Sequence, residues 1–392
     1  MTANIIAPVE ISQEFGQLVV KGNDIYRLYG EELHAKKYFV PIKNYSLSES
    51  DERKFLIHET FHEPLSKKPG PTPISSDQAY DLAIRKRLEA PIWERAYKIT
   101  GDISVSGNRG FIFVNGWLFK PSTYEIPPPH HNLYKFAVEK MRKSSSKCIE
   151  CDEALLVRHT LGHIYFHTYH DLLTKIVWAN ELGIDPKIPI VVSDKWAKGH
   201  YGKHFIQSDL FKSRKIIFQG LNDHLVCNTL YWLRTPQYHK EHLEQVANSF
   251  GEKKPKENYS DRLVLIREKK THDNRFCDGY EKLTDKLLSG GYSVIDPAEL
   301  SIPEQKWIFA RASHIVGLNG SAFTNIVHRQ KGDLRIDSII PSRSPTSTFQ
   351  AIAKAYGFTM NSHLVHSERN QDGVVALLDD DRINRIASSA LN

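Results

Sequence analysis

Two side chains capable of acid–base chemistry stand four residues apart in the segment Tyr165-Phe-His-Thr-Tyr-His-Asp171. The spacing of apolar residues around them predicts a helix, and on a helix His167 and Asp171 would share one face. An imidazole oriented by a carboxylate is a general base, and a carboxylate can also take a proton itself. The segment therefore offers His167 or Asp171 as the base of a catalysed reaction. A partly buried aromatic helix with a purely structural histidine would show the same pattern.

A second segment has the residue types of an anion site. The run Ile315-Val-Gly-Leu-Asn-Gly-Ser-Ala-Phe-Thr-Asn325 predicts a buried strand, a glycine-containing turn and the start of a helix. Free N–H groups and a partial positive charge at a helix start hold phosphates, and small residues let a ligand approach the backbone. A plain strand-to-helix connection fits the same residues. The candidate ligand contacts in this turn are Asn319, Gly320, Ser321, Thr324 and Asn325.

Three charged residues are candidates for the same site. Arg267 ends the first strand predicted in the second half of the chain, and Arg275 follows in the next loop. Guanidinium groups bind phosphates through two hydrogen bonds, although surface salt bridges are an equal interpretation. Glu304 is the third candidate. Because it stands three residues after Ser301, it also fits a capping box at a helix start.

Other patterns give weaker signals. Cys148 and Cys151 precede His159 and His163, but the gap is short for a zinc finger, and we interpret the four residues as unrelated. The acidic run at 379–381 is better explained as the cap of a final helix at 382–391 than as a metal–diphosphate motif. The sequence has neither a GxGxxG fingerprint nor a P-loop, which argues against a dinucleotide dehydrogenase and against an ATPase or kinase.

The composition indicates a globular protein of two or three domains. The chain has 392 residues, of which 40% are hydrophobic and 25% charged, with a net charge of +6. No run of eighteen apolar residues and no signal peptide are present, so we expect a cytoplasmic protein. Basic clusters at 85–87, 140–143 and 253–256 would suit an anionic membrane surface. No nucleic-acid-binding module is recognisable.

Strands and helices alternate along most of the chain. A hairpin is predicted at 111–119, with Asn115-Gly116 as its turn. Alternation of this kind predicts an α/β fold with parallel sheets, whose ligands bind beyond the carboxyl ends of the strands. The predicted strands are 154–157, 188–192, 215–218, 263–266, 292–295, 314–317 and 334–340. The predicted helices are 165–182, 201–211, 280–288, 303–312, 321–327 and 348–356.

In their order and spacing, these segments resemble glycosyltransferase family 61 in its bacterial, capsule and surface-polysaccharide form. The resemblance runs from about residue 153 to about 366. Its segments are 165–167, Asp171, 181–189, 262–267, Arg275, 292–300, 304–305, 312–317 and 320–325. The chain also departs from the family, which usually has His-Gly where Asn319-Gly320 stands here. Further departures are Ile164, Thr174-Lys175, Ile266 and Asp337.

The resemblance implies a GT-B architecture of two Rossmann-like lobes facing a cleft. It also implies a nucleotide-sugar donor, inversion at the anomeric carbon and no metal. Arginines and a helix start would then neutralise the departing diphosphate. We expect an N-terminal extension at 1–100, an acceptor-side lobe at 101–244 and a nucleotide-sugar-binding lobe at 245–365. A tail at 366–392 would pack back on the first lobe, and 239–260 would form a linker.

These observations predict an inverting, metal-independent hexosyl- or pentosyltransferase. Its donor would be a UDP-sugar and its acceptor a glycan, including a lipid-linked one at the inner membrane face. Two alternatives remain open from the sequence: a nucleotide-sugar epimerase of the same fold, and a non-catalytic protein that binds a glycan or a nucleotide.

Overall fold

The structure is a computed structural model. It describes residues 95–107, 109–114, 117–119, 147–234, 238–266, 275–342, 346, 348–370 and 373–391, and the backbone at 11–12, 17–21, 39–40 and 56–61. Two compact units make up the chain. The first unit comprises residues 1–64 and 93–237, and the second comprises 65–92 and 238–392.

The first unit is built on a mixed sheet that runs β1-β2-β4-β5-β11-β8-β9-β10. Strands β11, β8, β9 and β10 are mutually parallel, whereas β5 pairs with β11 in the antiparallel sense. The core between these strands contains Tyr97, Ile103, Leu156 and Trp232. The strands are β1 Ile11–Ser12, β2 Gln17–Lys21, β3 Phe39–Val40, β4 Leu56–Phe61, β5 Arg95–Ser106, β6 Ile112–Val114, β7 Trp117–Phe119, β8 Cys148–Leu156, β9 Ile190–Ser193, β10 Ile216–Gln219 and β11 His224–Arg234.

The predicted hairpin is confirmed by the antiparallel pairing of β6 with β7, and its turn residues lie outside the described part. The predicted strand at 154–157 begins earlier, at Cys148. Because successive side chains of a strand point to opposite faces, Cys148 and Cys151 lie on opposite faces of β8. This geometry supports the interpretation that the two cysteines do not form a zinc finger.

The helices of the first unit follow β8 and β9. A continuous helical segment comprises α4 Tyr165–His167, the π-helix η3 Thr168–Leu173 and α5 Thr174–Glu181. It ends two residues before Gly183, whose φ of 68° is left-handed, a conformation that glycine commonly adopts just after a helix. The helix predicted at 201–211 is interrupted. The shorter helices are α6 Asp194–Lys198, α7 His200–Phe205 and α8 Asp209–Lys212.

The second unit contains a wholly parallel five-stranded sheet in the order β14-β12-β15-β16-β17. A smaller sheet has the order β13-β19-β18. The expectation of an α/β chain with parallel sheets is therefore confirmed. The strands are β12 Arg262–Leu265, β13 Arg275–Asp278, β14 Ser293–Ile295, β15 His314–Leu318, β16 Arg335–Pro341, β17 Thr359–Val365, β18 Ser367–Asn370 and β19 Gly373–Leu377. The helices are α9 Lys240–Asn248, α10 Tyr280–Ser289, the 3-10 helix η4 Pro297–Glu299, α11 Ile302–Phe309, the 3-10 helix η5 Ser321–His328, α12 Thr348–Tyr356 and α13 Asp380–Leu391.

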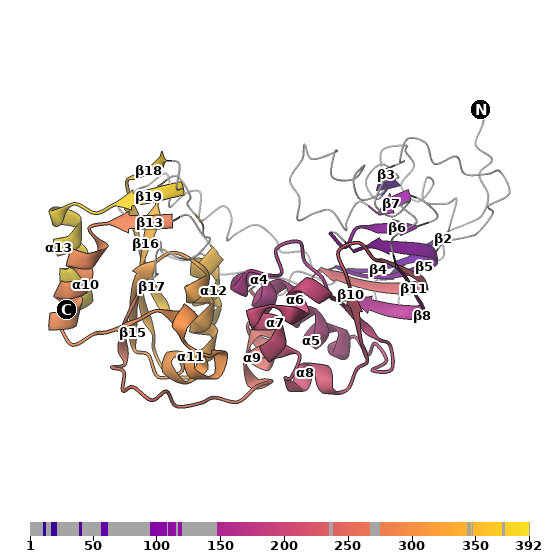
Figure 1. Ribbon diagram of the computed structural model, residues 1–392, viewed down its shortest axis with the longest axis horizontal. Helices are drawn as coiled ribbons and strands as arrows, with labels where there is room; N and C mark the ends of the chain where they lie inside the picture. The colour runs from indigo at the N-terminus through magenta and orange to yellow at the C-terminus, as the bar shows by residue number, and fades with distance from the viewer. Residues whose placement is uncertain are drawn as a thin grey trace. The chain divides into compact units, whose positions relative to one another are not determined.

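Helices cover both faces of the five-stranded sheet (Figure 1). Helices α10 and α13 pack together on one face, over a core that includes Val264, Val316 and Ile383. Helices α11 and α12 lie with η5 on the other face, where Phe323 packs against Phe349. This two-sided burial explains why the strands read as nearly continuous apolar runs in the sequence.

Two expectations about the chain's organisation are wrong. The segment expected to be a linker contains α9, because Leu243, Val246 and Ala247 form a buried stripe among its charged residues. Lys306 of α11 donates hydrogen bonds to the carbonyl of Ala247, near the end of α9, and to that of Phe250, just after it. These bonds hold α9 against α11. The tail expected to pack on the first lobe lies instead in the second unit, with α13 against α10.

The final helix begins where the acidic run predicted a cap. Asp379 Oδ1 accepts from the Arg382 backbone N–H at 2.7 Å, and Asp380 and Asp381 lie in the first turn. The capping interpretation of residues 379–381 is therefore confirmed. No helix in the described ranges is both long and apolar enough to cross a membrane.

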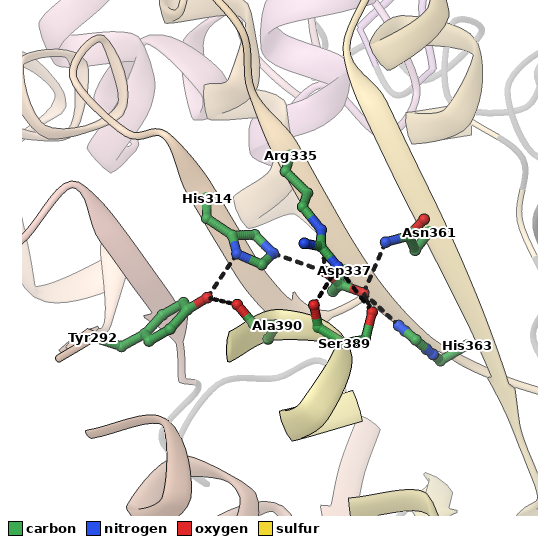
Figure 2. Close-up of polar contacts among 8 residues, drawn as sticks. All are labelled: Tyr292, His314, Arg335, Asp337, Asn361, His363, Ser389 and Ala390. Atoms are coloured by element: carbon green, nitrogen blue, oxygen red, sulfur yellow. Dashed lines mark hydrogen bonds and ion pairs between the residues drawn. The ribbon is translucent and has the colours of Figure 1, made fainter. Parts of the chain in front are cut away.

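A fully buried carboxylate connects α13 to the sheet (Figure 2). Asp337 on β16 accepts hydrogen bonds from His314 Nε2 at 2.7 Å, His363 Nε2 at 2.6 Å and Asn361 Nδ2 at 3.1 Å. Ser389 on α13 adds a longer contact of 3.4 Å to the same carboxylate. Burial alone raises the pKa of Asp337, but the hydrogen bonds from His314, His363 and Asn361 and the charge of His363 lower it overall.

Hydrogen-bond accounting fixes the protons around His314. The Tyr292 hydroxyl lies 2.7 Å from the Ala390 carbonyl, which can only accept, so its single proton is used there. The Tyr292 oxygen, 2.6 Å from His314 Nδ1, must therefore accept a proton from that nitrogen. The other ring nitrogen, Nε2, faces Asp337, so His314 bridges the Tyr292 hydroxyl and the buried carboxylate.

Replacing Asp337 by Asn should therefore release α13 from the sheet. The change removes a buried charge to which three side chains donate hydrogen bonds, which should cost about 3 kcal/mol of unfolding free energy. The folded pKa of Asp337 lies below its ordinary value of 3.8, so its contribution is present above about pH 4 and is lost as the pH falls. The measurement is hydrogen exchange of the α13 amides between pH 3 and 7.

Asp380→Asn is the matched control on the same helix. Asp380 forms an exposed ion pair with Lys282, and its loss should change stability by less than about 0.5 kcal/mol. Equal protection of α13 in the Asp337→Asn and Asp380→Asn proteins would contradict the role given to the buried carboxylate.

Candidate functional site

The centre of the first unit's candidate site is a hydrogen bond on the helical segment after β8. His167 ends α4, Asp171 lies within η3, and His167 Nδ1 is 2.7 Å from Asp171 Oδ2. Every residue of the π-helix is buried, whereas His167 retains part of its surface. A π-turn in the middle of an α-helix is a frequent feature of functional sites. The prediction that His167 and Asp171 share one face is confirmed.

The two members of this pair differ in access to solvent. The Asp171 side chain is 2% exposed and the His167 side chain 21% exposed. An ionised carboxylate only accepts, so His167 donates its Nδ1–H to Asp171 and keeps the Nε2 lone pair. Asp171 therefore fixes the tautomer of a histidine that a ligand can reach.

A third residue, His159, joins the pair from the connection between β8 and α4. Its ring stacks on His167, with centroids 4.6 Å apart and planes 14° apart. Its Nε2 lies 3.7 Å from Asp171 Oδ2, and its Nδ1 accepts from the Leu161 backbone N–H at 3.0 Å. Burial lowers the pKa of His159 to about 3, with a smaller opposing effect from Asp171. The sequence suggested His159 only as part of a weak zinc pattern and gave no signal for this contact.

The donor atoms of His159, His167 and Asp171 all lie within 4.8 Å of one another. Two imidazoles and one carboxylate are a donor set that binds zinc or iron. A metal-bound histidine normally donates from its other nitrogen, but His159 Nδ1 accepts a hydrogen bond instead. Two nearly parallel stacked rings also do not direct their in-plane lone pairs at one ion. The local geometry therefore fits a proton network better than a metal centre.

The anion-binding turn predicted in the second unit connects β15 to η5. Gly320 precedes the first residue of η5, and its backbone is fully extended. The N–H of Phe323 bonds to the Gly320 carbonyl, so the N–H groups of Ser321 and Ala322 precede the first hydrogen bond of this helix. Ser321 and Ala322 are both partly exposed. A strand, a glycine turn and a helix start are thus present, with a 3-10 helix where a helix was predicted.

Three of the five predicted contacts in this turn point into the protein. Asn319 is buried and donates from Nδ2 to Ser338 Oγ at 2.9 Å. Asn325 is fully buried and donates from Nδ2 to Gln305 Oε1 at 2.8 Å. Thr324 is fully buried as well. These side chains hold the turn in place, and Ser321 is left as the partly exposed polar side chain among the predicted contacts.

One comparison with known proteins indicates the class of enzyme to which the chain belongs. Residues 165–334 match the family model for Glycosyltransferase 61. The protein is a glycosyltransferase. The match covers less than half of the chain, and it contains both the His167–Asp171 pair and the turn before η5. The capsule and surface-polysaccharide subtype expected from the sequence goes beyond what this match shows.

Two further comparisons give no functional lead. No curated protein matches the chain. Among solved structures, a metal-soaked flavodiiron core from Synechocystis aligns over 90% of this chain and 96% of its own, at 8% identity and a TM-score of 0.22. A similarity of this size supports no conclusion about the fold or the chemistry of the glycosyltransferase.

The arginines predicted to bind phosphate are only partly placed by the structure. Arg267 lies outside the described residues. Arg275 was expected in a loop but begins β13, which pairs with β19 in parallel. In the glycosyltransferase both arginines therefore remain predictions from the sequence.

Glu304 has the capping role that its spacing also predicted. Its Oε2 accepts from the Ser301 backbone N–H at 3.1 Å and from the Ser301 hydroxyl at 2.6 Å, and its Oε1 pairs with Lys253 at 2.9 Å. The hydrogen bonds from Ser301 and Lys253 lower the pKa of Glu304 to about 2. Because both carboxylate oxygens are engaged in the protein, we no longer assign Glu304 to the donor site.

Replacing Glu304 by Ala should therefore reduce stability rather than donor binding. Loss of the capping box should cost about 1 kcal/mol in urea unfolding, while the dissociation constant of the donor nucleotide changes less than twofold. Since the folded pKa of Glu304 is below its ordinary value of 4.5, its contribution is present above that pH and is lost as the pH falls toward 2. A tenfold loss of nucleotide affinity at unchanged stability would return Glu304 to the binding site.

Proposed function

We propose that the protein is an inverting, metal-independent glycosyltransferase that moves a sugar from a UDP-sugar to a glycan acceptor in bacterial surface-polysaccharide biosynthesis. The observation that carries the proposal is the His167–Asp171 hydrogen bond within a glycosyltransferase 61 match. Glycosyl transfer to a hydroxyl needs one group to take the acceptor proton and another to stabilise the leaving diphosphate. The first unit offers the former and the second unit offers candidates for the latter.

His167 is the base in this proposal, and Asp171 orients it. The choice follows from exposure, because an acceptor hydroxyl can reach a 21% exposed imidazole but not a 2% exposed carboxylate. The Asp171 carboxylate also stabilises the imidazolium that forms when Nε2 takes the proton. The two candidates left open by the sequence thus become one base and one positioning residue.

The donor diphosphate is proposed to bind at the start of η5. The backbone N–H groups of Ser321 and Ala322 and the Ser321 hydroxyl supply donors there, together with the partial positive charge of the helix start. Arg267 and Arg275 are proposed to neutralise the remaining phosphate charge. Charge neutralisation by arginines and a helix start replaces the divalent cation that other transferases use.

The reaction then follows with each bond accounted for. His167 Nε2 takes the proton of the acceptor hydroxyl while that oxygen attacks the anomeric carbon. The bond from the anomeric carbon to the diphosphate oxygen breaks, and UDP leaves with the electron pair. Attack from the face opposite the diphosphate inverts the configuration. The GT-B arrangement expected from the sequence is part of this proposal.

The setting proposed for this reaction is the cytoplasm at the inner membrane face, with a lipid-linked acceptor included. Exposed Lys254 and Lys256, in the basic segment between α9 and β12, suit the anionic headgroups found there.

A panel of UDP-sugars, each assayed with and without acceptor glycans, tests the function. We expect UDP release that depends on the acceptor and continues in EDTA, since no step uses a metal. Conversion of the donor to another UDP-sugar without any acceptor would indicate an epimerase instead. Donor binding without turnover on any acceptor would indicate a binding protein, and inactivation by EDTA would contradict the metal-free mechanism.

His167→Ala should lower kcat by about 1,000-fold, because general-base catalysis contributes roughly 100- to 10,000-fold. Asp171→Asn should lower kcat by a smaller factor, since the base remains but its tautomer is no longer fixed. Both variants should keep donor affinity within threefold in calorimetric titrations. A His167→Ala enzyme with wild-type kcat would remove His167 from the reaction.

Arg267→Ala and Arg275→Ala should each weaken UDP binding by about tenfold or more, because each removes a charge-assisted phosphate contact. Arg311→Ala is the matched control, since this exposed arginine pairs with Glu252 on the surface. UDP affinities equal to that of the control would refute the phosphate assignment.

A further inference from the structure

We propose that His159 is a positioning residue that holds the ring of the catalytic base through stacking. This inference rests on the proposed function, because it assigns to His159 an effect exerted through His167. His159 belongs to the turn between β8 and α4, whereas His167 and Asp171 belong to the helical segment that follows. The residue would act without touching the substrate.

The first observation is the contact between the two rings. A centroid distance of 4.6 Å and an interplanar angle of 14° place the imidazoles nearly parallel and in contact. The hydrogen bond to Asp171 fixes one nitrogen of His167 but leaves the ring free to tilt about that bond. A flat surface against one face of the ring removes this freedom, and small errors in a base's position lower rates strongly.

The second observation is that His159 is itself fixed at both ends. The Leu161 N–H donates to Nδ1, so the neutral ring carries its proton on Nε2. That N–H faces Asp171 Oδ2 at 3.7 Å, which is longer than a hydrogen bond but favourable to the carboxylate charge. His159 is therefore oriented by the backbone at one nitrogen and by charge at the other.

The third observation is the charge state of His159. Its side chain is 4% exposed, and the ionisable groups around it are Asp171, Lys175, His167 and His163. Lys175 is buried and donates from Nζ to the Arg158 carbonyl. Burial, supported by the charge of Lys175, lowers the pKa of His159 to about 3, so its ring is neutral at neutral pH. A neutral ring can remain stacked on His167 while that ring gains and loses a proton.

Three substitutions separate ring stacking from the Nε2–H group. His159→Phe keeps a flat ring without the N–H, His159→Gln keeps an N–H donor without the ring, and His159→Ala removes both. We expect kcat to fall about tenfold in the Gln and Ala proteins but less than threefold in the Phe protein. The acceptor KM should stay within twofold throughout. His204→Gln is the matched control, because this histidine of α7 packs on Phe205 and should leave kcat unchanged.

The pH profile provides a readout that a merely structural residue would not move. In the Ala protein, water enters beside His167 and favours the charged ring, so the acidic limb of the kcat profile should move to higher pH by about half a unit. The limb should stay in place in the Phe protein. Wild-type kcat and pH profile in the Ala protein, or rescue by Gln but not by Phe, would overturn the stacking role.

A measurement without turnover covers the case in which a variant does not fold. The wild-type protein and a folded His159 variant are both labelled with ¹⁵N-histidine, and the ring signals that the variant lacks are those of His159. If no His159 variant folds, sequential assignment of the wild-type protein identifies these signals. They should show a proton on Nε2 and no titration between pH 5 and 8. A proton on Nδ1, or a titrating ring, would overturn the inference by itself.

The outcomes also keep the inference apart from the proposed function. If His167→Ala retains wild-type kcat, the base assignment fails whatever the His159 variants do. If His167→Ala inactivates the enzyme but His159→Ala does not, only the inference fails.

Discussion

A carboxylate removed from water must be surrounded by donors, and each unit of this chain contains an aspartate under that constraint. Asp171 and Asp337 are almost completely buried, and in both cases two histidines supply compensation. Leaving either charge unpaired would cost several kcal/mol, so the neighbouring elements must bring the donors to it. For Asp171 these elements are α4, which carries His167, and the turn before it, which carries His159. For Asp337 they are β15, β17 and α13.

The two carboxylates differ in what their partners connect. Around Asp337, His314 lies against Tyr292, whose hydroxyl bonds to the Ala390 carbonyl, and Ser389 links the carboxylate to α13. The other histidine at Asp337, His363, keeps 22% of its side chain exposed, as His167 at Asp171 keeps 21%. The Asp337 network therefore attaches a helix, and each carboxylate orients one histidine that solvent can reach.

The sequence predicted the features that depend on local periodicity. The His167–Asp171 pair was predictable because both residues lie on one continuous helical segment. The strands of the second sheet were predictable because burial on both faces makes them apolar throughout. Helix α9 was missed because Leu243 and Val246 form a narrow stripe in a charged segment. His159 was missed because its contact depends on how the chain turns between β8 and α4, which no spacing encodes.

The turn before η5 shows how a correct prediction of local structure can misjudge where the side chains point. The strand, the glycine and the helix start could be read from small residues in order, but the direction of each side chain depends on neighbouring elements. Asn319 is held by Ser338 of β16, and Asn325 by Gln305 of α11. Both amides therefore fix the backbone of the turn against the sheet and a helix.

This arrangement also changes the meaning of Asn319, which stands where the resembled family usually has histidine. Because Asn319 is only 1% exposed, its side chain would not contact a donor bound at this turn. It determines where Gly320 lies, and with it the N–H groups of Ser321 and Ala322. The Asn319 side chain, bonded to Ser338, is shorter than the imidazole of a histidine. The two residues would therefore hold the backbone of the turn at different distances from Ser338. A difference in donor preference would then arise from the position of the backbone donors rather than from a lost side-chain contact.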